Sequence, residues 1–146
     1  MAVESVGLAA SIAGLLSLGL QITGGIATYL DALENREEEL QSARRQNDAL
    51  VGALAAIKRA GSQFQGQHNH VSGIAQSIQA CETELLAVES LLAKLTNCDT
   101  ATWRQRLKSK KQKLRYAFDR SKVQQVTQRL HNANGILQIT LTGLGL

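Results

Sequence analysis

The sequence contains no proline and has few aromatic side chains, which make up 3% of its 146 residues. Because proline breaks a helix more strongly than any other residue, its absence leaves long helices uninterrupted. The shortage of flat rings argues against a surface that stacks on nucleic-acid bases or on sugars. Hydrophobic residues nevertheless reach 44%, which is too many for a disordered tail and enough to build the core of one domain.

Cysteine and histidine are also scarce, and those present match no catalytic or metal-binding motif. Cys81 and Cys98 are the only thiols, and without a basic leader segment they indicate reduced cysteines in a cytoplasmic protein. His68 and His70 fall short of a four-ligand metal set, and His131 lies inside a helical pattern. Phosphate-loop and Gly-x-Ser-x-Gly motifs are missing too. We therefore predict that the protein is not an enzyme and has no catalytic residue, metal or cofactor.

Apolar residues recur at steps of three and four along four segments, which predicts four helical units. The units cover residues 3–33, 35–60, 71–95 and 102–141, the last with a pause at 118–121. Their core-facing positions are Leu8, Ile12, Leu15, Gly19, Ile22, Ile26, Tyr29 and Leu33; Leu40, Ala43, Asn47, Leu50, Leu54 and Ile57; Val71, Ile74, Ile78, Cys81, Leu85, Val88, Leu92 and Leu95; and Val123, Val126, Leu130, Ala133, Leu137 and Leu141. Narrow stripes on helices joined by short loops predict an all-α fold, a four- to five-helix antiparallel bundle.

Polar residues mark the expected helix starts and one position inside the core. Asn35 and Thr102 are expected to cap the second and fourth units, and Ser121 a second start after the pause. Asn47 interrupts the apolar seam of the second unit. A polar residue at such a position can fix helix register at a cost in stability.

No charged residue occurs between Glu4 and Asp31, a stretch of 26 residues. As a helix it spans about 39 Å, more than the roughly 30 Å of a bilayer's hydrocarbon layer. Its ten Leu, Ile and Val residues favour insertion by roughly 3–6 kcal/mol, but its glycines, serines, threonines and Gln21 offset much of this. The segment therefore lies near balance between a protein core and a bilayer. A helix that stays in the core is the alternative.

If this segment enters a membrane, the residues predicted to insert are its large apolar ones. They are Val6, Leu8, Ile12, Leu15, Leu16, Leu18, Leu20, Ile22 and Ile26. Leu16, Leu18 and Leu20 lie off the core-facing stripe, so the helix is apolar on several faces. Its alanines, serines and glycines would also let helices approach closely inside a bilayer.

Positive charge is concentrated in one run. Nine of the sixteen basic residues and one of the twelve acidic residues lie between Arg104 and Lys122, so this block carries +8 and the rest of the chain −4. The residues predicted to dock on anionic lipid are Trp103, Arg104, Arg106, Lys108, Lys110, Lys111, Lys113 and Arg115. Basic residues interleaved with aromatic ones suit a membrane surface. One alternative is a nuclear-import or nucleic-acid patch, and another is a solvated helix face. A specific nucleic-acid partner is not expected.

Several segments resemble one family. Residues 6–16 (VGLAASIAGLL) and 29–33 (YLDAL) are similar to the start of the fungal HeLo-like domains at the N-terminus of STAND, or NLR-like, proteins. Residues 103–108 (WRQRLK) and 114–118 (LRYAF) resemble the basic, tryptophan-containing region before that family's last helix, and residues 126–141 resemble that helix.

The resemblance implies a bundle related to HeLo and MLKL-type cell-death domains. It implies that residues 1–146 are one domain, the N-terminal part of a longer protein whose downstream NLR-type regulatory region drives homo-oligomerisation. The clustered bundles would then move from the cytoplasm to the plasma membrane and permeabilise it through the N-terminal helix. The outcome would be regulated cell death of the incompatibility or innate-immunity type. The alternative is a helical adaptor for self-association or partner recruitment without membrane activity.

Overall fold

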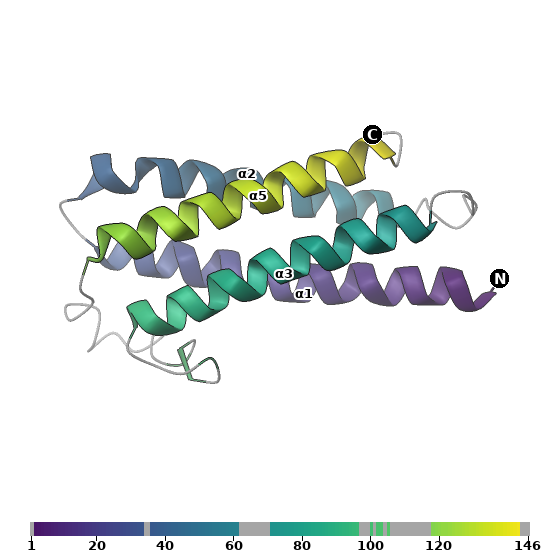
Figure 1. The fold of residues 1–146 in the computed structure, drawn as a ribbon, viewed down its shortest axis with the longest axis horizontal. Coiled ribbons are helices and arrows are strands. Elements are labelled where there is room, and N and C mark those ends of the chain that lie inside the picture. The colour runs from purple at the N-terminus through teal and green to yellow at the C-terminus, as the bar shows by residue number, and fades with distance from the viewer. Residues whose placement is uncertain are drawn as a thin grey trace.

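The structure, a computed structural model, is entirely helical in the part that it describes (Figure 1). Described are residues 2–33, 36–61, 71–96, 100, 102, 103, 105 and 118–143, with side chains from residue 10 onward and not at 61, 71, 72 and 143. The helices are α1 (Ala2–Ala32), α2 (Glu37–Gly61), α3 (Val71–Leu95) and α5 (Arg120–Gly143). The all-α prediction is confirmed, and the first three helices end within two residues of their predicted bounds.

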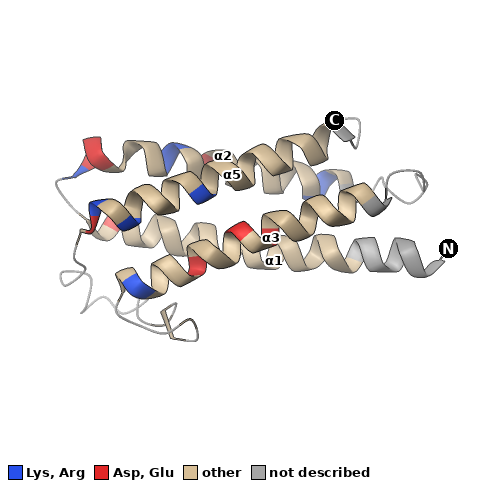
Figure 2. Cartoon of the chain, in the orientation of Figure 1, with Lys and Arg blue, Asp and Glu red and all other residues tan. Residues whose placement is uncertain are grey.

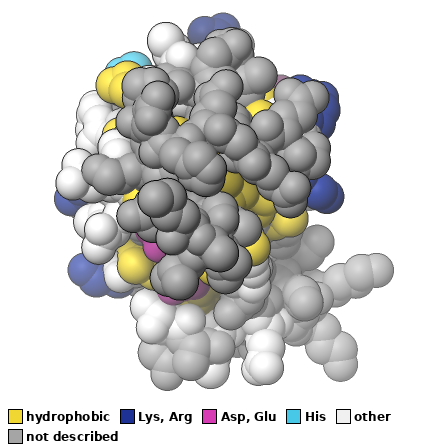
Figure 3. Space-filling model, turned by 90° about the vertical axis from the view of Figure 1, so that its right-hand side faces the viewer, with side chains coloured by type: hydrophobic (Ala, Val, Ile, Leu, Met, Phe, Trp, Pro, Cys, Tyr) yellow, Lys and Arg dark blue, Asp and Glu magenta, His cyan; other side chains and the backbone are white. Residues whose placement is uncertain are grey.

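The four helices lie lengthwise beside one another as a bundle. Helix α1 packs against α2 and α3, and α5 packs against the same two helices. This pairing puts α1 and α5 at opposite corners. The first turn of α1 and the last turn of α5 lie at the same end of the molecule (Figure 1). Viewed from this end, Lys and Arg side chains lie around the rim, and hydrophobic side chains show between the elements toward the middle (Figure 3).

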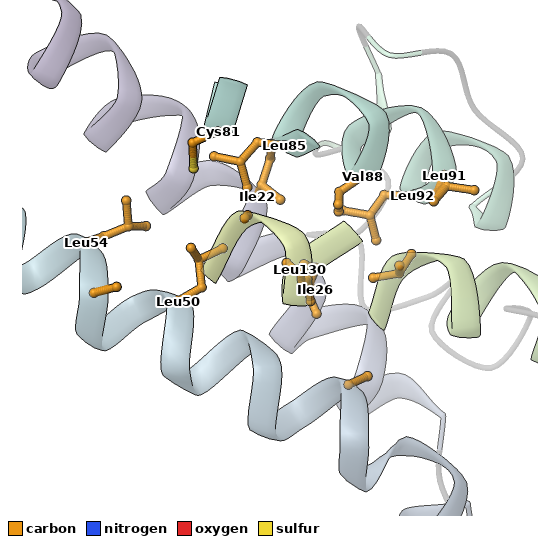
Figure 4. Packing of buried hydrophobic residues seen from close by; sticks show 14 of the residues in the cluster. Ile22, Ile26, Leu50, Leu54, Cys81, Leu85, Val88, Leu91, Leu92 and Leu130 are labelled. Atoms are coloured by element: carbon orange, nitrogen blue, oxygen red, sulfur yellow. The ribbon is translucent and has the colours of Figure 1, made fainter. Parts of the chain in front are cut away.

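The core is formed by the positions that the apolar spacing selects. Every predicted core-facing residue whose side chain is described is buried, and Leu15, Leu50, Leu85 and Leu130 are fully so. Side chains from all four helices point toward one another (Figure 4). Since each fully buried Leu or Ile contributes about 1.5–3 kcal/mol, this shared core is the main source of stability.

Charges at the two ends of α2 follow its helix dipole (Figure 2). Three glutamates, Glu37 to Glu39, occupy the first turn of α2, and Lys58 and Arg59 its last turn. Negative charge at the start and positive charge at the end of a helix are each stabilising. The predicted cap at Asn35 lies outside the described residues.

The start of α5 differs from the prediction. Its backbone begins at Arg120, and the Lys122 amide donates to Oδ1 of Asp119 at 3.0 Å. Asp119 is thus the N-cap, and the predicted cap at Ser121 is wrong. The side chain of Lys122 also donates to Asp119 at 2.9 Å, and its hydrogen bonds lower the pKa of that carboxyl. A carboxylate held by both the amide and an ammonium is a stronger cap than a serine hydroxyl.

Candidate functional site

Helix α1 carries the residues predicted to insert into a membrane, and the structure distributes them over several environments. Ile12, Leu15, Ile22 and Ile26 are buried in the core, and Leu16 and Leu18 are partly buried against it. Leu20 is 62% exposed. The side chains of Val6 and Leu8 lie outside the described part. The stretch Ala10–Ala32, with a mean hydropathy of 1.5, is long and apolar enough to cross a membrane, a test that the core helix of a soluble protein also passes.

Two threonine side chains of α1 find partners within the helix itself. The Thr23 hydroxyl donates to the Gly19 carbonyl at 2.8 Å, and the Thr28 hydroxyl donates to the Gly24 carbonyl at 3.0 Å. Because these bonds join residues of one helix, they do not depend on the rest of the bundle. Helix α1 therefore keeps them in any surroundings in which it stays helical.

The contact between α1 and α2 contains a closely packed glycine and an asparagine whose side-chain amide is only partly hydrogen-bonded. Nδ2 of Asn47 donates to the Thr23 carbonyl at 3.1 Å, while Oδ1 of Asn47 is buried with no hydrogen-bond partner among the described atoms. Gly19 lies against Leu54, since a Cβ at Gly19 would come within 2.5 Å of its Cδ1. A buried acceptor without a partner costs about 1–3 kcal/mol. The prediction that Asn47 sits in the core is confirmed, and it weakens this contact.

A polar pairing joins α2 to α5 one residue away from Asn47. Nδ2 of Asn134 donates to the backbone carbonyl of Gln46 at 3.0 Å and to its side-chain Oε1 at 2.8 Å. Oδ1 of Asn134 is also buried without a partner among the described atoms. Sequence reasoning missed this pair. Its only signal was the position of Asn134 next to the core residue Ala133.

Trp103 lies on the other side of α1, and its place corrects the prediction. The side chain was expected at a lipid surface, but it is 0% exposed and belongs to the core of the bundle. Its indole nitrogen donates to Oε2 of Glu89 on α3 at 3.3 Å. A Cβ at Gly25 of α1 would lie 2.6 Å from Cη2 of the indole, so the ring rests directly on the α1 backbone. Sequence spacing gives no sign of this partner, because Gly25 is far away along the chain.

The basic run itself is not placed. Arg104, Arg106, Lys108, Lys110, Lys111, Lys113 and Arg115 lie outside the residues whose side chains are described. The run is followed by Phe118, which packs partly against the core and carries the Arg36 guanidinium 4.4 Å above its ring. Arg120 pairs with Glu39 at 3.4 Å. These contacts tie the start of α5 to the start of α2, although exposed ion pairs of this kind contribute at most about 1 kcal/mol.

Neither thiol nor metal chemistry is supported by the described side chains. Burial raises the pKa of the Cys81 thiol to about 12, which leaves it protonated and unreactive at neutral pH. Within the described residues, no group of three or more His, Cys, Asp and Glu side chains could hold a metal ion. The candidate site is therefore α1 with its contacts to Asn47 and Trp103. Comparison of the chain with protein-family models, with curated proteins and with solved structures gives no match.

Proposed function

We propose that this chain is the N-terminal effector domain of a fungal NLR-like receptor of the HeLo-like type. On oligomerisation it targets the plasma membrane and permeabilises it, which leads to regulated cell death. The observation that carries the proposal is α1, which has no charge between Glu4 and Asp31 and whose Thr23 and Thr28 hydroxyls are hydrogen-bonded within the helix. The resemblance of residues 6–16, 103–108 and 114–118 to the family supports the same function.

Transfer of α1 from the bundle to a bilayer breaks few polar interactions. The contacts that it loses include the bond from Asn47 to the Thr23 carbonyl and the exposed ion pair between Asp31 and Arg44 at 2.9 Å. Its apolar face exchanges one apolar surrounding for another. Helix α2 offers a contrast, because charged residues such as Arg45, Asp48 and Lys58 line its exposed surface. Burying those charges in lipid would cost several kcal/mol each.

Docking and clustering then supply the driving force. In this proposal the domain is cytoplasmic at rest, and the basic run from Arg104 to Arg115 binds anionic lipid headgroups, with about 1 kcal/mol from each Lys or Arg. A downstream NLR-type region brings copies together. Multivalent docking multiplies the weak insertion tendency of each α1 without a new contact.

The antiparallel sense of neighbouring helices is part of the proposal, and connection lengths support it. Four residues, 33–36, separate α1 from α2. Nine residues, 62–70, separate α2 from α3, and the ten steps from Gly61 to Val71 reach at most about 36 Å when extended. A 25-residue helix is about 37 Å long, so the first connection is too short to return the chain to the far end of the bundle, and the second would have to be fully extended to do so.

Release of a trapped dye from liposomes tests the membrane function. We expect leakage from vesicles that contain phosphatidylserine and none from neutral ones. Leu20→Lys places a charge on the exposed face of α1 and should abolish leakage, while the free energy of unfolding changes by less than about 0.5 kcal/mol. Ile139→Lys is the matched control, because Ile139 is 70% exposed on α5 and should be dispensable. Equal leakage from both variants would overturn the proposal.

An adaptor without membrane activity is the second candidate. Two large apolar side chains, Ile139 and the 51% exposed Leu86, lie on the surface of α5 and α3 and are available to a partner or a second copy. An adaptor would form a defined oligomer in solution, and Leu86→Lys or Ile139→Lys would dissociate it. It would also release no dye at any lipid composition.

A further inference from the structure

Trp103 is buried in the core, and its side chain also contacts two different helices. It comes from the connection between α3 and α5, yet its ring lies against the backbone of α1 at Gly25, while its indole nitrogen is held by Glu89 of α3. One side chain thus bridges two helices to which it does not belong. It is also the only tryptophan of the chain.

Gly25 is the residue that makes this contact possible. Any other residue at this position would put its Cβ 2.6 Å from Cη2 of the indole, and nearer still to Cζ3. At Gly19 a Cβ would meet the flexible end of Leu54, which can turn away. A planar indole enclosed on all sides has no such freedom, because only two torsions move it. The ring therefore occupies the space that a side chain at position 25 would take. We call this space the notch at Gly25.

We propose that Trp103, seated in the notch at Gly25 and held by Glu89, is a latch that keeps α1 in the bundle. Withdrawal of the indole releases α1 on its α3 side. On the α2 side, α1 is held by the contact that contains the imperfectly bonded Asn47. The latch rests on the proposed function in one respect only, namely that the released helix is the one that enters a membrane.

A pair of neighbouring glycines provides the test in the absence of lipid. Gly25→Ala and Gly24→Ala give the same gain in helix propensity, but a Cβ at Gly24 meets nothing within 4 Å. We expect Gly25→Ala to shift the emission of Trp103 to longer wavelength. It should also raise amide-hydrogen exchange in residues 10–32 by about tenfold relative to α5. Gly24→Ala should leave both unchanged. Identical emission and exchange in the two variants would overturn the latch.

Trp103→Leu separates release of α1 from general misfolding. This variant should itself speed exchange in α1 while α5 stays protected. Adding Gly25→Ala to it should cause no further increase, because the collision is with the indole that has been removed. A double variant that loses protection in every helix, or that exchanges faster than Trp103→Leu alone, would contradict the proposal.

Vesicle leakage then distinguishes this proposal from the membrane function. Gly25→Ala should release dye several-fold faster than the unmodified protein, and Gly24→Ala at the same rate as the unmodified protein. If exchange in α1 rises in Gly25→Ala but no protein releases dye, the latch stands and the membrane function falls. If the unmodified protein releases dye but exchange in α1 is the same in both glycine variants, the function stands and the latch falls.

Discussion

Asn47 occupies a core position of α2 with only one of its polar side-chain atoms hydrogen-bonded among the described residues. Its Nδ2 reaches the Thr23 carbonyl, an atom that can also accept the ordinary helical bond of α1. The unpartnered Oδ1 carries the desolvation penalty without compensation. A leucine at this position would instead bury apolar surface against α1. Asn47 therefore makes the α1–α2 contact weaker than an apolar residue of the same size would.

Asn47→Leu tests this effect at one residue. We expect the free energy of unfolding to rise by about 1 kcal/mol, measured as a higher midpoint of urea denaturation, because an unpartnered acceptor is removed. Leakage of anionic vesicles should slow, since α1 is held more firmly. Asn47→Asp is the control and should destabilise the fold by burying a charge. A lower midpoint for Asn47→Leu would show that the asparagine strengthens the contact.

The buried thiol of Cys81 makes the stability of the fold depend on pH in the alkaline range. Burial, with Glu82 and Glu84 nearby, raises the pKa of the thiol from 9.0 to about 12. The folded protein therefore keeps a proton that the unfolded chain loses above pH 9. Stability from this group is complete below pH 9 and is lost as the pH rises from 9 toward 12. Burial and Asp119 raise the pKa of Tyr29 from 10.0 to about 12, so its contribution is lost only above pH 10.

The urea midpoint should accordingly fall between pH 8.5 and pH 10. Cys81→Ala should have a lower midpoint at every pH, because it leaves a cavity, but the fall between these two values should be smaller. Tyr29 is present in both proteins, so the difference between the two falls reports the thiol and not the Tyr29 hydroxyl. An equally steep fall in Cys81→Ala would mean that the thiol is not the group responsible.

At the scale of elements, α1 and α2 differ in what their exposed faces carry. Both helices bury a regular apolar stripe, but α1 has no charged residue between Glu4 and Asp31, whereas the exposed face of α2 carries charge of both signs. In the proposed function, this difference makes α1 and not α2 the helix that leaves the bundle for lipid. It depends on the whole length of α1 and not on one position.

Lysine substitutions at two matched alanines test whether the uncharged surface of α1 is required for leakage. Ala13 on α1 and Ala55 on α2 are both exposed, so lysine at either position should leave the fold intact. Each lysine also adds one positive charge that favours anionic lipid. We expect Ala13→Lys to abolish leakage although it binds vesicles at least as well as the unmodified protein, and Ala55→Lys to leak normally. Leakage lost in both variants or in neither would contradict a special role of α1.

The elements were predictable from sequence because their signals are local and repeated. Steps of three and four define α1, α2 and α3 almost to the residue, and the burial of Asn47 follows from its place in the same series. The start of α5 was mispredicted because Ser121 and Gln124 match a capping box, while Asp119, two residues earlier, binds the Lys122 amide more strongly. Trp103 was assigned to the surface from its basic neighbours in sequence. Its seat at Gly25 depends on tertiary packing, which no spacing rule reveals.

At the scale of the whole molecule, the proposed function requires α1 to separate from the other three helices. Helix α5 contacts both α2 and α3, so these three helices remain linked when α1 is absent. Like each of the other described helices, α1 has two main neighbours; its contact with α2 contains the half-bonded Asn47, and Trp103 lies on its other side. The sequence could not predict which helices contact each other, because it shows the apolar stripe of each helix but not the helix against which that stripe packs.

The uneven distribution of charge is a second property of the whole molecule. If the basic run docks on lipid, Lys108, Lys110, Lys111 and Lys113 replaced together by glutamine should weaken binding to phosphatidylserine vesicles by at least about a hundredfold at low salt. Sedimentation with vesicles measures this. Replacing the exposed Arg45, Lys58, Arg59 and Lys94 instead removes the same charge from other places. Equal loss of binding in both variants would show that only net charge matters.

Release of α1 can be blocked directly by a covalent bond to α2. A Cβ at Gly19 would lie 3.4 Å from Cγ of Leu54, so cysteines at these two positions can form a disulfide, with Cys98→Ser removing the competing thiol. We expect the oxidised protein to bind phosphatidylserine vesicles without releasing dye, and the same sample to release dye once it is reduced. An oxidised protein that leaks as fast as the reduced one would show that α1 does not have to leave the bundle.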